Sequence, residues 1–175
     1  PVICARDLVG VWLSWEGRGG FVVETEAYAA EGDPACHTWT RPSARAFVAG
    51  HEAGAAYVYF NYGVHWMLNV LIKGPVPGFV LLRALDPREG LADMQAARGT
   101  EKPTALCSGP GKLARALGVT GSDHGRDLCL PGGPGFRRRV EPVTVESSPR
   151  IGISRAVDLP WRFFAAGNPH VSRPR

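Results

Sequence analysis

The stretch that decides the fold is Val22-Val23-Glu24-Thr25-Glu26-Ala27-Tyr28, in which two carboxylates and an aromatic ring alternate at the end of a β-branched apolar run. Successive side chains of a strand point to opposite faces, so Glu24, Glu26 and Tyr28 are predicted to share one face, about 7 Å apart along it. Acidic groups beside an aromatic ring at a strand end favour a chemical site. The alternative is a solvated edge strand whose glutamates face water.

Further strands are predicted where β-branched or aromatic residues cluster between Gly, Pro or Asn. These segments are Gly20–Glu26, Ala56–Tyr62, Val64–Ile72, Phe79–Leu85, Val140–Glu146 and Arg150–Ser154. The second and third are expected to pair as a hairpin around Tyr62-Gly63.

Two helices are indicated by residues typical of helix ends. Asp86 as N-cap, with Pro87 at the first position, predicts a helix that ends at Arg98. Ser108 is predicted to cap a second helix, which ends before Gly118. The buried stripe of this second helix is expected to consist of Leu113, Ala116 and Leu117.

Length and composition limit the class of protein. With 175 residues the chain fits one domain, residues 1–175, and its 22 glycines and 15 prolines indicate many turns between apolar runs. Pro131–Gly135 is predicted to be a surface loop, and the basic run Arg137–Arg139 follows it. The net charge of +4 modestly favours a polyanionic partner.

Cysteine usage and the length of the apolar runs bear on the compartment. The four cysteines are far apart, with no Cys-x-x-Cys pair, so reduced and partly buried thiols are expected. Pro1 to Ala5 lacks the basic and apolar regions of a secretory signal, and no apolar run approaches the ~18 residues of a membrane span. We therefore expect a soluble, intracellular protein with no membrane partner.

Two polar residues interrupt apolar strand segments. Arg83 lies within Phe79–Leu85, and an arginine in such a run is rarely buried unless a carboxylate or phosphate pairs with it. Glu24 or Glu26 supplies that partner if the two strands share a sheet, either as a functional pair or as a structural ion pair. Asn69 raises the same question, because a buried amide without partners costs about 1–3 kcal/mol. It is either satisfied by backbone or in contact with a ligand.

Aromatic side chains are concentrated in residues 56–66. Tyr57 and Tyr59 are predicted on one face of a strand, with Tyr62 at the turn. An aromatic at an exposed hairpin tip can wedge into stacked bases, where stacking contributes about 1–3 kcal/mol per base. Aromatic stripes on strands are otherwise typical of a core, so Tyr62 differs from them only if the turn projects it.

The segment Ser108-Gly109-Pro110-Gly111-Lys112 resembles an anion cradle. Free N–H groups at a helix N-terminus, with Lys112 nearby, suit a phosphate, and the alternative is an ordinary capped helix. It is not a Walker A loop, because Leu113 follows the lysine where Ser or Thr is required. No metal site is expected, since adjacent Cys36 and His37 cannot comfortably ligate one ion and no second pair has zinc-ligand spacing.

Several of these segments occur together in an order and spacing that extend over nearly the whole chain. They are Glu24–Tyr28, Asp33–His37, Tyr57–Tyr59, Tyr62-Gly63, Asn69, Leu81–Leu85 and Cys107–Pro110. Together they resemble the alkyladenine (3-methyladenine) DNA glycosylase family. The resemblance implies a mixed α/β (α+β) fold in a single domain, with a curved, mainly antiparallel sheet flanked by helices and a β-hairpin that inserts into DNA. It also implies a monofunctional base-excision repair enzyme without lyase activity and without a cofactor.

The resemblance implies roles for individual residues. Glu26 falls where the family's general base activates water, while Arg83 and the backbone carbonyl of Ile151 fall where that water is held. The family also flips the damaged base out of the DNA duplex. Tyr28, His37 and Tyr59 fall at the positions whose side chains stack on that base.

Two further positions carry over from the same resemblance. Tyr62 matches the residue that fills the gap left in the duplex, and Asn69 matches the one that opposes the exocyclic amino group of normal guanine. In addition, a backbone phosphate of DNA fits the helix start at Ser108, Gly109 and Lys112.

The implied partner is double-stranded DNA that contains alkylated or deaminated purines: 3-methyladenine, 7-methylguanine, hypoxanthine or ethenoadenine. Alkylation at N3 or N7 leaves the purine positively charged, so electron-rich rings attract it more than the neutral base, by about 0.5–2 kcal/mol per contact. Flipping costs a few kcal/mol, least for a damaged or mispaired base. We expect a monomer located with the DNA, in the nucleoid or the nucleus.

Two other functions compete with this reading. A non-catalytic damaged-DNA-binding module has no need for Glu26 and Arg83 together. A nucleoside N-ribohydrolase has no use for Tyr62 or for the run Arg137–Arg139, which suit a polymer.

The sequence departs from the family pattern between Thr40 and Gly54. Arg45–Gly50 stands where an Arg-Asn and Met-Phe segment is usual, so the contacts of that loop do not carry over from the resemblance. Ala165–Gly167 also replaces a more basic stretch, which is expected to weaken non-specific affinity for DNA.

Overall fold

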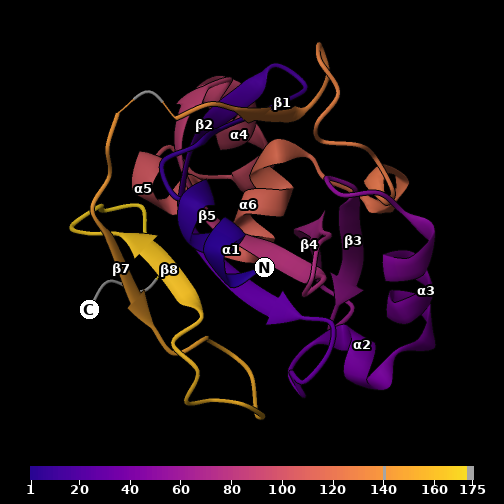
Figure 1. The fold of residues 1–175 in the computed structure, drawn as a ribbon. Helices are drawn as coiled ribbons and strands as arrows, with labels where there is room; N and C mark the ends of the chain where they lie inside the picture. Colours follow the sequence, from indigo (N-terminus) through magenta and orange to yellow (C-terminus); the bar gives the residue numbers. More distant parts are fainter. Residues whose placement is uncertain (140, 173–175) are drawn as a thin grey trace.

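A computed structural model of the chain describes residues 1–139 and 141–172, which form a curled antiparallel sheet with helices packed against it (Figure 1). The predicted mixed α/β fold with a curved, mainly antiparallel sheet is therefore confirmed. In chain order the elements are α1 (Val2–Leu8), β1 (Trp12–Trp15), β2 (Arg18–Ala29), α2 (His37–Thr40), α3 (Pro42–Gly50), β3 (Ala56–Asn61), β4 (His65–Ile72), β5 (Gly78–Glu89), α4 (Leu91–Arg98), α5 (Pro103–Leu106), α6 (Pro110–Leu117), the 3-10 helix η1 (Gly121–Asp123), β6 (Gly135–Arg137), β7 (Val145–Ser148) and β8 (Arg162–Ala165).

Strands β2 and β5 run side by side through the middle of the sheet. The strand order is β3-β4-β5-β2-β1-β6, and β8 adds to β2 while pairing on its other side with β7. Nearly every residue of β2 and β5 is buried, because strands or helices cover both faces of this central pair. Side chains at the middle of these two strands are therefore held by packing on all sides, which suits a site that needs fixed geometry.

A shift in register lies at the point where β2 and β5 carry their charged residues. Glu24 pairs with Ala84 and Thr25 pairs with Leu82, so Arg83 has no residue directly opposite. An extra residue of this kind increases the local twist and redirects its side chain. The side chain of Arg83 turns toward the acidic side chains of β2.

Four of the six predicted strands are confirmed as β2, β3, β4 and β5. The prediction of a strand over Arg150–Ser154 is wrong, because this segment is a loop that forms no ladder with any strand of the described residues: the Arg150 guanidinium donates to the carbonyl of Ala27, and the Ile151 amide donates to the side chain of Glu26. The strand predicted over Val140–Glu146 begins only at Val145, and Val140 itself lies outside the described residues. The short strands β1, β6 and β8 were not predicted, and the predicted loop Pro131–Gly135 ends at the first residue of β6.

The helix predicted from Asp86 to Arg98 starts later than expected. Its first four residues continue β5, which runs to Glu89, because pairing with β2 overrides the local N-cap and proline signal. Helix α4 begins only after Gly90, and its predicted end at Arg98 is confirmed.

Helix α6 also has a different N-cap from the one predicted. Gly109 occupies that position with φ +138°, a conformation that only glycine adopts readily, while Ser108 forms a β-bridge to Ala84. The predicted end before Gly118 is confirmed. All three residues of the expected apolar stripe are buried: Leu113, Ala116 and Leu117.

The segment that departs from the family pattern folds into α3 and builds a second, smaller core. Phe47 is 4% exposed, and its ring centroid lies 5.1 Å from that of Tyr57 and 6.3 Å from that of Phe79. This cluster also packs against Tyr28 and Tyr59. Phe47 thus supports several aromatic rings of the central strands.

Replacing Phe47 by Ala is expected to destabilise the fold by about 3–5 kcal/mol, because it removes a buried ring and leaves a cavity under the aromatic cluster. Urea unfolding followed by circular dichroism measures this loss. Val48→Ala, on the same helix but only half buried, is the control and should cost clearly less. Equal stability of Phe47→Ala and wild type would contradict the packing role.

The cysteines and helices bear on two further expectations. The four cysteines are free, with Cys36 and Cys107 buried, Cys4 half-buried and Cys129 exposed, in agreement with the expected free thiols. Within residues 1–139 and 141–172, no helix has the length and apolar character needed to cross a bilayer.

Candidate active site

A cavity of about 570 Å³ opens between β3, β4, the start of α2 and the loop that follows β7. The structure brings to its lining seven side chains or backbone segments that the sequence singled out: Tyr28, His37, Tyr59, Tyr62, Asn69, Arg83 and Ile151. The residues come from five separate stretches of the chain. Their convergence agrees with the expectation of one aromatic-walled pocket.

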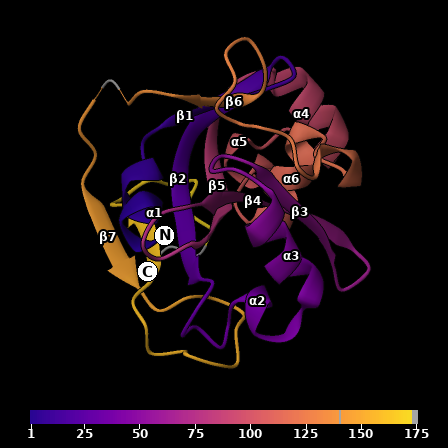
Figure 2. The same cartoon turned by 45° about the vertical axis from the view of Figure 1, so that its right-hand side comes forward.

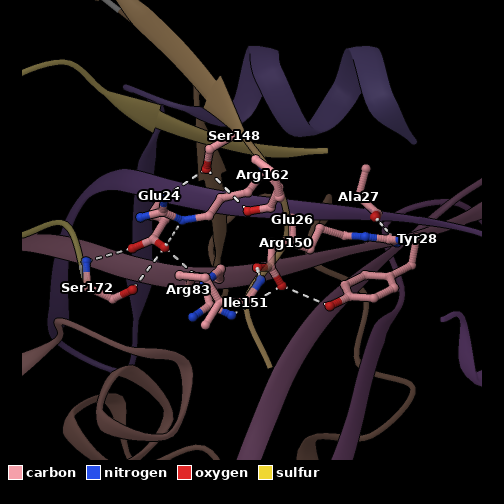
Figure 3. Close-up of polar contacts among 11 residues, drawn as sticks. Glu24, Glu26, Ala27, Tyr28, Arg83, Ser148, Arg150, Ile151, Arg162 and Ser172 are labelled. Carbon is pink, nitrogen blue, oxygen red and sulfur yellow. Dashed lines mark hydrogen bonds and ion pairs between the residues drawn. The ribbon is translucent and has the colours of Figure 1, made fainter. Parts of the chain in front are cut away.

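Glu26 lies fully buried behind the lining, and three groups of the cavity wall contact its carboxylate (Figure 3). The hydroxyl of Tyr28 donates to Oε2 at 2.8 Å, and the guanidinium of Arg83 lies 3.1 Å from the same oxygen. The backbone N–H of Ile151 donates to Oε1 at 2.7 Å. Both carboxylate oxygens are thus fixed in orientation, which is what a group that must position one small reactant requires.

Glu24 occupies the centre of a second, adjoining cluster. Its Oε1 accepts from Nε of Arg83 at 2.9 Å and from Nε of Arg162 at 2.7 Å, and the backbone N–H of Ser172 donates to Oε2 at 2.6 Å (Figure 3). Arg162 also donates to the hydroxyl of Ser148 at 2.9 Å. The prediction that Arg83 pairs with a β2 carboxylate is confirmed, since it contacts both glutamates.

The charges in these two clusters stabilise one another. Burial opposes ionisation of Glu24, but Arg83, Arg162 and the hydrogen bond from Ser172 outweigh it and lower the pKa of this carboxyl. Burial likewise opposes the charge on Arg83, while Glu26 and Glu24 raise the pKa of its guanidinium. Arg83 is therefore held as a cation between two carboxylates.

Aromatic rings form the walls of the cavity. The ring of His37 lies edge-on to Tyr59, with centroids 4.3 Å apart, and Tyr57 lies 5.6 Å from Tyr59. Burial and then the charge of Glu26 raise the pKa of Tyr28, so its hydroxyl stays protonated and donates to that carboxylate. Burial, followed by the neighbouring Tyr57, raises the pKa of Tyr59 to about 12.

His37 was expected in a loop, but it is the first residue of the short helix α2. Its Nδ1 lies 3.1 Å from the hydroxyl of Tyr57. Burial, and secondarily the charge of Arg41, lowers the pKa of His37 to about 4. The imidazole is neutral at pH 7, so it adds no positive charge to the cavity wall.

We expect the stability of the protein to fall as the pH drops from about 6.5 to about 4, because the unfolded chain binds a proton at His37 more tightly than the folded one does. A shift of this size corresponds to about 3–3.5 kcal/mol, and His37→Gln should remove that part of the pH dependence. Urea unfolding at several pH values measures it, and an NMR titration of the His37 ring locates the pKa directly. Titration near 6.5 would contradict the buried, neutral state.

Tyr62, in the turn between β3 and β4, has the most exposed of the large apolar side chains. Tyr62 is 89% exposed and has φ +50°, which turns its side chain away from the sheet. Figure 2 shows the hairpin extending outward beside α3. The prediction that Tyr62 sits at a projecting turn is confirmed, and Val64 beside it is 63% exposed.

The remaining predicted residues do not all lie at the cavity. Asn69 donates to the carbonyl of Tyr57 at 3.0 Å, so its buried amide is satisfied by backbone while it also lines the cavity. The start of α6 lies at the rim, where Pro110 lines the cavity and Lys112 is exposed. The basic run Arg137–Arg139 is not brought to the site, because β6 forms the opposite end of the sheet order from β3.

Four residues of the site were not singled out from the sequence. Two of them, Arg162 and Ser172, join the Glu24 cluster, and the other two, Asp33 and Arg150, form a fully buried ion pair with nitrogen–oxygen distances of 2.6 and 2.9 Å. Arg150 lies within a segment that was predicted as a strand. The signal that could have found Arg162 is that of Arg83, a charged residue next to apolar neighbours, as in Trp161-Arg162-Phe163.

No three His, Cys, Asp or Glu side chains of the described segments gather in an arrangement that could hold a metal ion. The adjacent Cys36 and His37 form no such group.

Comparison with known proteins places this geometry in context. The family model described as methylpurine-DNA glycosylase matches residues 1–169. A protein of Rhodopseudomonas palustris named "Putative 3-methyladenine DNA glycosylase" is 47% identical over 171 residues, which cover 97% of this chain and 84% of that protein. Proteins with the same name are 46% identical in Granulibacter bethesdensis, over 98% of this chain and 82% of theirs, and 43% identical in Nitrosospira multiformis, over 97% and 88%.

Proposed function

The chain belongs to the methylpurine-DNA glycosylase family, and from that premise we propose that it removes alkylated or deaminated purines from double-stranded DNA by hydrolysing their N-glycosidic bonds. It is a DNA glycosylase of the 3-methyladenine type and acts in DNA repair. The observation that carries the finer proposal is Glu26, a carboxylate fixed by three donors directly behind a cavity with aromatic walls. The whole of residues 1–175 acts as one glycosylase domain, as a monomer located with the DNA.

The proposed reaction uses Glu26 as the general base. A water held by Arg83 and by the carbonyl of Ile151 gives a proton to Glu26 and attacks C1′ of the sugar, while the bond from C1′ to the purine nitrogen breaks. The electrons of that bond go to the departing base, so a positively charged alkylated purine leaves as a neutral molecule, whereas a neutral purine such as hypoxanthine leaves as an anion that takes a proton from solvent water. Orientation of one water by fixed groups is the main contribution, and no cofactor takes part.

The walls of the cavity favour a cationic base. Tyr28 and Tyr59 remain uncharged phenols because burial raises the pKa of each, and the lowered pKa of His37 keeps the imidazole neutral. Each ring face that meets a positively charged purine contributes about 0.5–2 kcal/mol. Asn69 also lines the cavity, which supports the proposal that its side chain opposes the exocyclic amino group of normal guanine.

The proposal includes base flipping, with Tyr62 entering the duplex in place of the extruded nucleotide. Its exposed position at the hairpin turn supports this role, because the same hairpin carries Tyr59 into the cavity. Ser108, Gly109 and Lys112 at the start of α6 would meet a backbone phosphate near the cavity rim.

Tyr62→Ser is expected to weaken binding of lesion-containing duplex about 10-fold or more, because base stacking contributes about 1–3 kcal/mol. Fluorescence anisotropy measures the affinity, and 2-aminopurine beside the lesion reports flipping. Val76→Ser, at an exposed apolar residue of the β4–β5 connection, is the control. Equal affinity of Tyr62→Ser and wild type would remove the wedge from the proposal.

A panel of duplexes that each contain one damaged purine tests the function. The wild-type protein should release 7-methylguanine, 3-methyladenine, hypoxanthine or ethenoadenine and leave an abasic site without cutting the strand. Free nucleosides should not be hydrolysed, and their turnover would indicate a nucleoside N-ribohydrolase. Tight binding of damaged duplex without any released base would indicate a recognition module.

A further inference from the structure

We propose that the buried Asp33–Arg150 ion pair is a brace that joins two walls of the cavity and holds both Tyr28 and the Ile151 amide against Glu26. Arg150 is then a positioning residue for the reaction, and this inference rests on the proposed function.

The contacts within the pair are close and complete. Nη1 of Arg150 donates to one carboxylate oxygen of Asp33 at 2.6 Å and Nη2 donates to the other at 2.9 Å. Both side chains are fully buried. Asp33 also accepts from the backbone N–H groups of Ala29 and Ala35, at 3.2 and 3.0 Å, so the acid is itself fixed in place. A planar guanidinium that meets a carboxylate with two parallel bonds defines the relative orientation of the two chain segments.

The pair connects segments that form different walls of the cavity. Asp33 directly precedes the stretch that carries His37, and Arg150 directly precedes Ile151, whose loop also lines the cavity. The two residues are 117 positions apart in sequence. Figures 1 and 2 both show the loop after β7 running next to the chain between β2 and α2. The width of the cavity between these walls therefore depends on the brace.

Arg150 also touches the surroundings of Glu26. Its guanidinium carbon lies 4.7 Å from the ring centroid of Tyr28 and 5.2 Å from that of Trp161, and Nη1 donates to the carbonyl of Ala27 at 2.9 Å (Figure 3). Tyr28 and Ile151 are two of the three groups that bond to Glu26. One side chain thus supports the ring on one side of the carboxylate and the backbone amide on the other.

A loosened brace should disturb the reaction more than the binding of DNA. Misplacing a reacting group by about 1 Å can cost about 10²-fold in rate. Among residues 1–139 and 141–172, Arg150 forms no hydrogen bond or ion pair with the exposed hairpin tip or with the start of α6, so the affinity for the duplex does not depend on it in the same way.

Arg150→Lys tests the brace, because lysine keeps the charge but cannot make the paired bonds or the planar contact with Tyr28. The single-turnover excision rate should fall about 10²-fold, while the Kd for damaged duplex changes less than about threefold. Asp33→Asn, which keeps the shape of the acid, should act in the same direction. Arg126→Lys is the matched control, since Arg126 also pairs with a carboxylate and lies 5.8 Å from a tryptophan ring, but it contacts none of the groups that bond to Glu26.

A second measurement needs no substrate. Hydrogen exchange at the Ile151 amide, followed by NMR, should be at least about tenfold faster in Arg150→Lys and unchanged in Arg126→Lys. Wild-type rate and wild-type exchange in Arg150→Lys would overturn the brace, as would equal losses in rate and affinity. Absence of excision by the wild-type protein would instead overturn the proposed function, and the exchange rates would then decide the inference by themselves.

Discussion

Glu26→Gln is expected to lower the rate of base excision by about 10²–10⁴-fold, the range typical of losing a positioned general base. The amide has the same shape as the acid but cannot take a proton from water. It also presents an NH₂ group to donors on every side, namely Tyr28, Arg83 and the Ile151 amide, so one of those hydrogen bonds is lost. Single-turnover kinetics on a hypoxanthine-containing duplex measure the effect.

Binding separates this explanation from misfolding. Glu26→Gln should retain the affinity of wild type for the damaged duplex, because Glu26 lies behind the lining of the cavity. Glu16→Gln, at a surface carboxylate paired with Arg126, is the matched control and should leave excision intact. Turnover by Glu26→Gln at the wild-type rate would remove Glu26 from the mechanism.

Glu24→Leu is expected to destabilise the protein by about 3–5 kcal/mol, the cost of removing one partner from a buried ion pair. The guanidinium groups of Arg83 and Arg162 would then share a buried site without their common carboxylate, and the Ser172 N–H would lose its acceptor. Excision should fall as well, because Arg83 would no longer be fixed beside Glu26. Urea unfolding at pH 7 measures the stability.

The matched control for Glu24 is Glu146, which pairs with Phe164 from the other side and is exposed. Glu146→Leu should change stability by less than about 0.5 kcal/mol. The pKa of Glu24 is lowered in the fold, so its contribution is present above about pH 4.5 and is lost as the pH falls through the folded value. The difference in the free energy of unfolding between wild type and Glu24→Leu should therefore become smaller in acid. Equal stability of the two proteins at pH 7 would contradict the role of the cluster.

The central strands could be predicted from local sequence patterns, because the β-branched and aromatic residues that indicate a strand are also the residues that the fold buries. Residues of β2 to β5 are β-branched or aromatic over long runs, and packing confirms what the runs indicate. Asp86 shows the opposite case. Its cap and proline signals are locally sound, yet the ladder with β2 extends through them to Glu89, since tertiary pairing can outweigh a local preference.

The site was predictable where a residue type is itself unusual for its position. Arg83 and Asn69 interrupt apolar strands, and both lie at the cavity. The pairing of Asp33 with Arg150 was not predictable, because it joins two loops across more than a hundred residues and neither sequence neighbourhood indicates a partner. Which acid meets which arginine depends on the curl of the sheet rather than on spacing along the chain.

The Ser172 contact has a consequence for how the molecule folds. Its amide and hydroxyl reach Glu24 across 148 residues of sequence. A partly folded chain that buries Glu24 and Arg83 before Ser172 has reached them lacks these donors, so the charge cluster is complete only once the two segments have met. Contacts between residues so far apart in sequence slow folding, because the entropy of closing a long loop is lost before the contact can form. The charged groups around Arg83 are thus fully fixed only when both of these distant segments are in place.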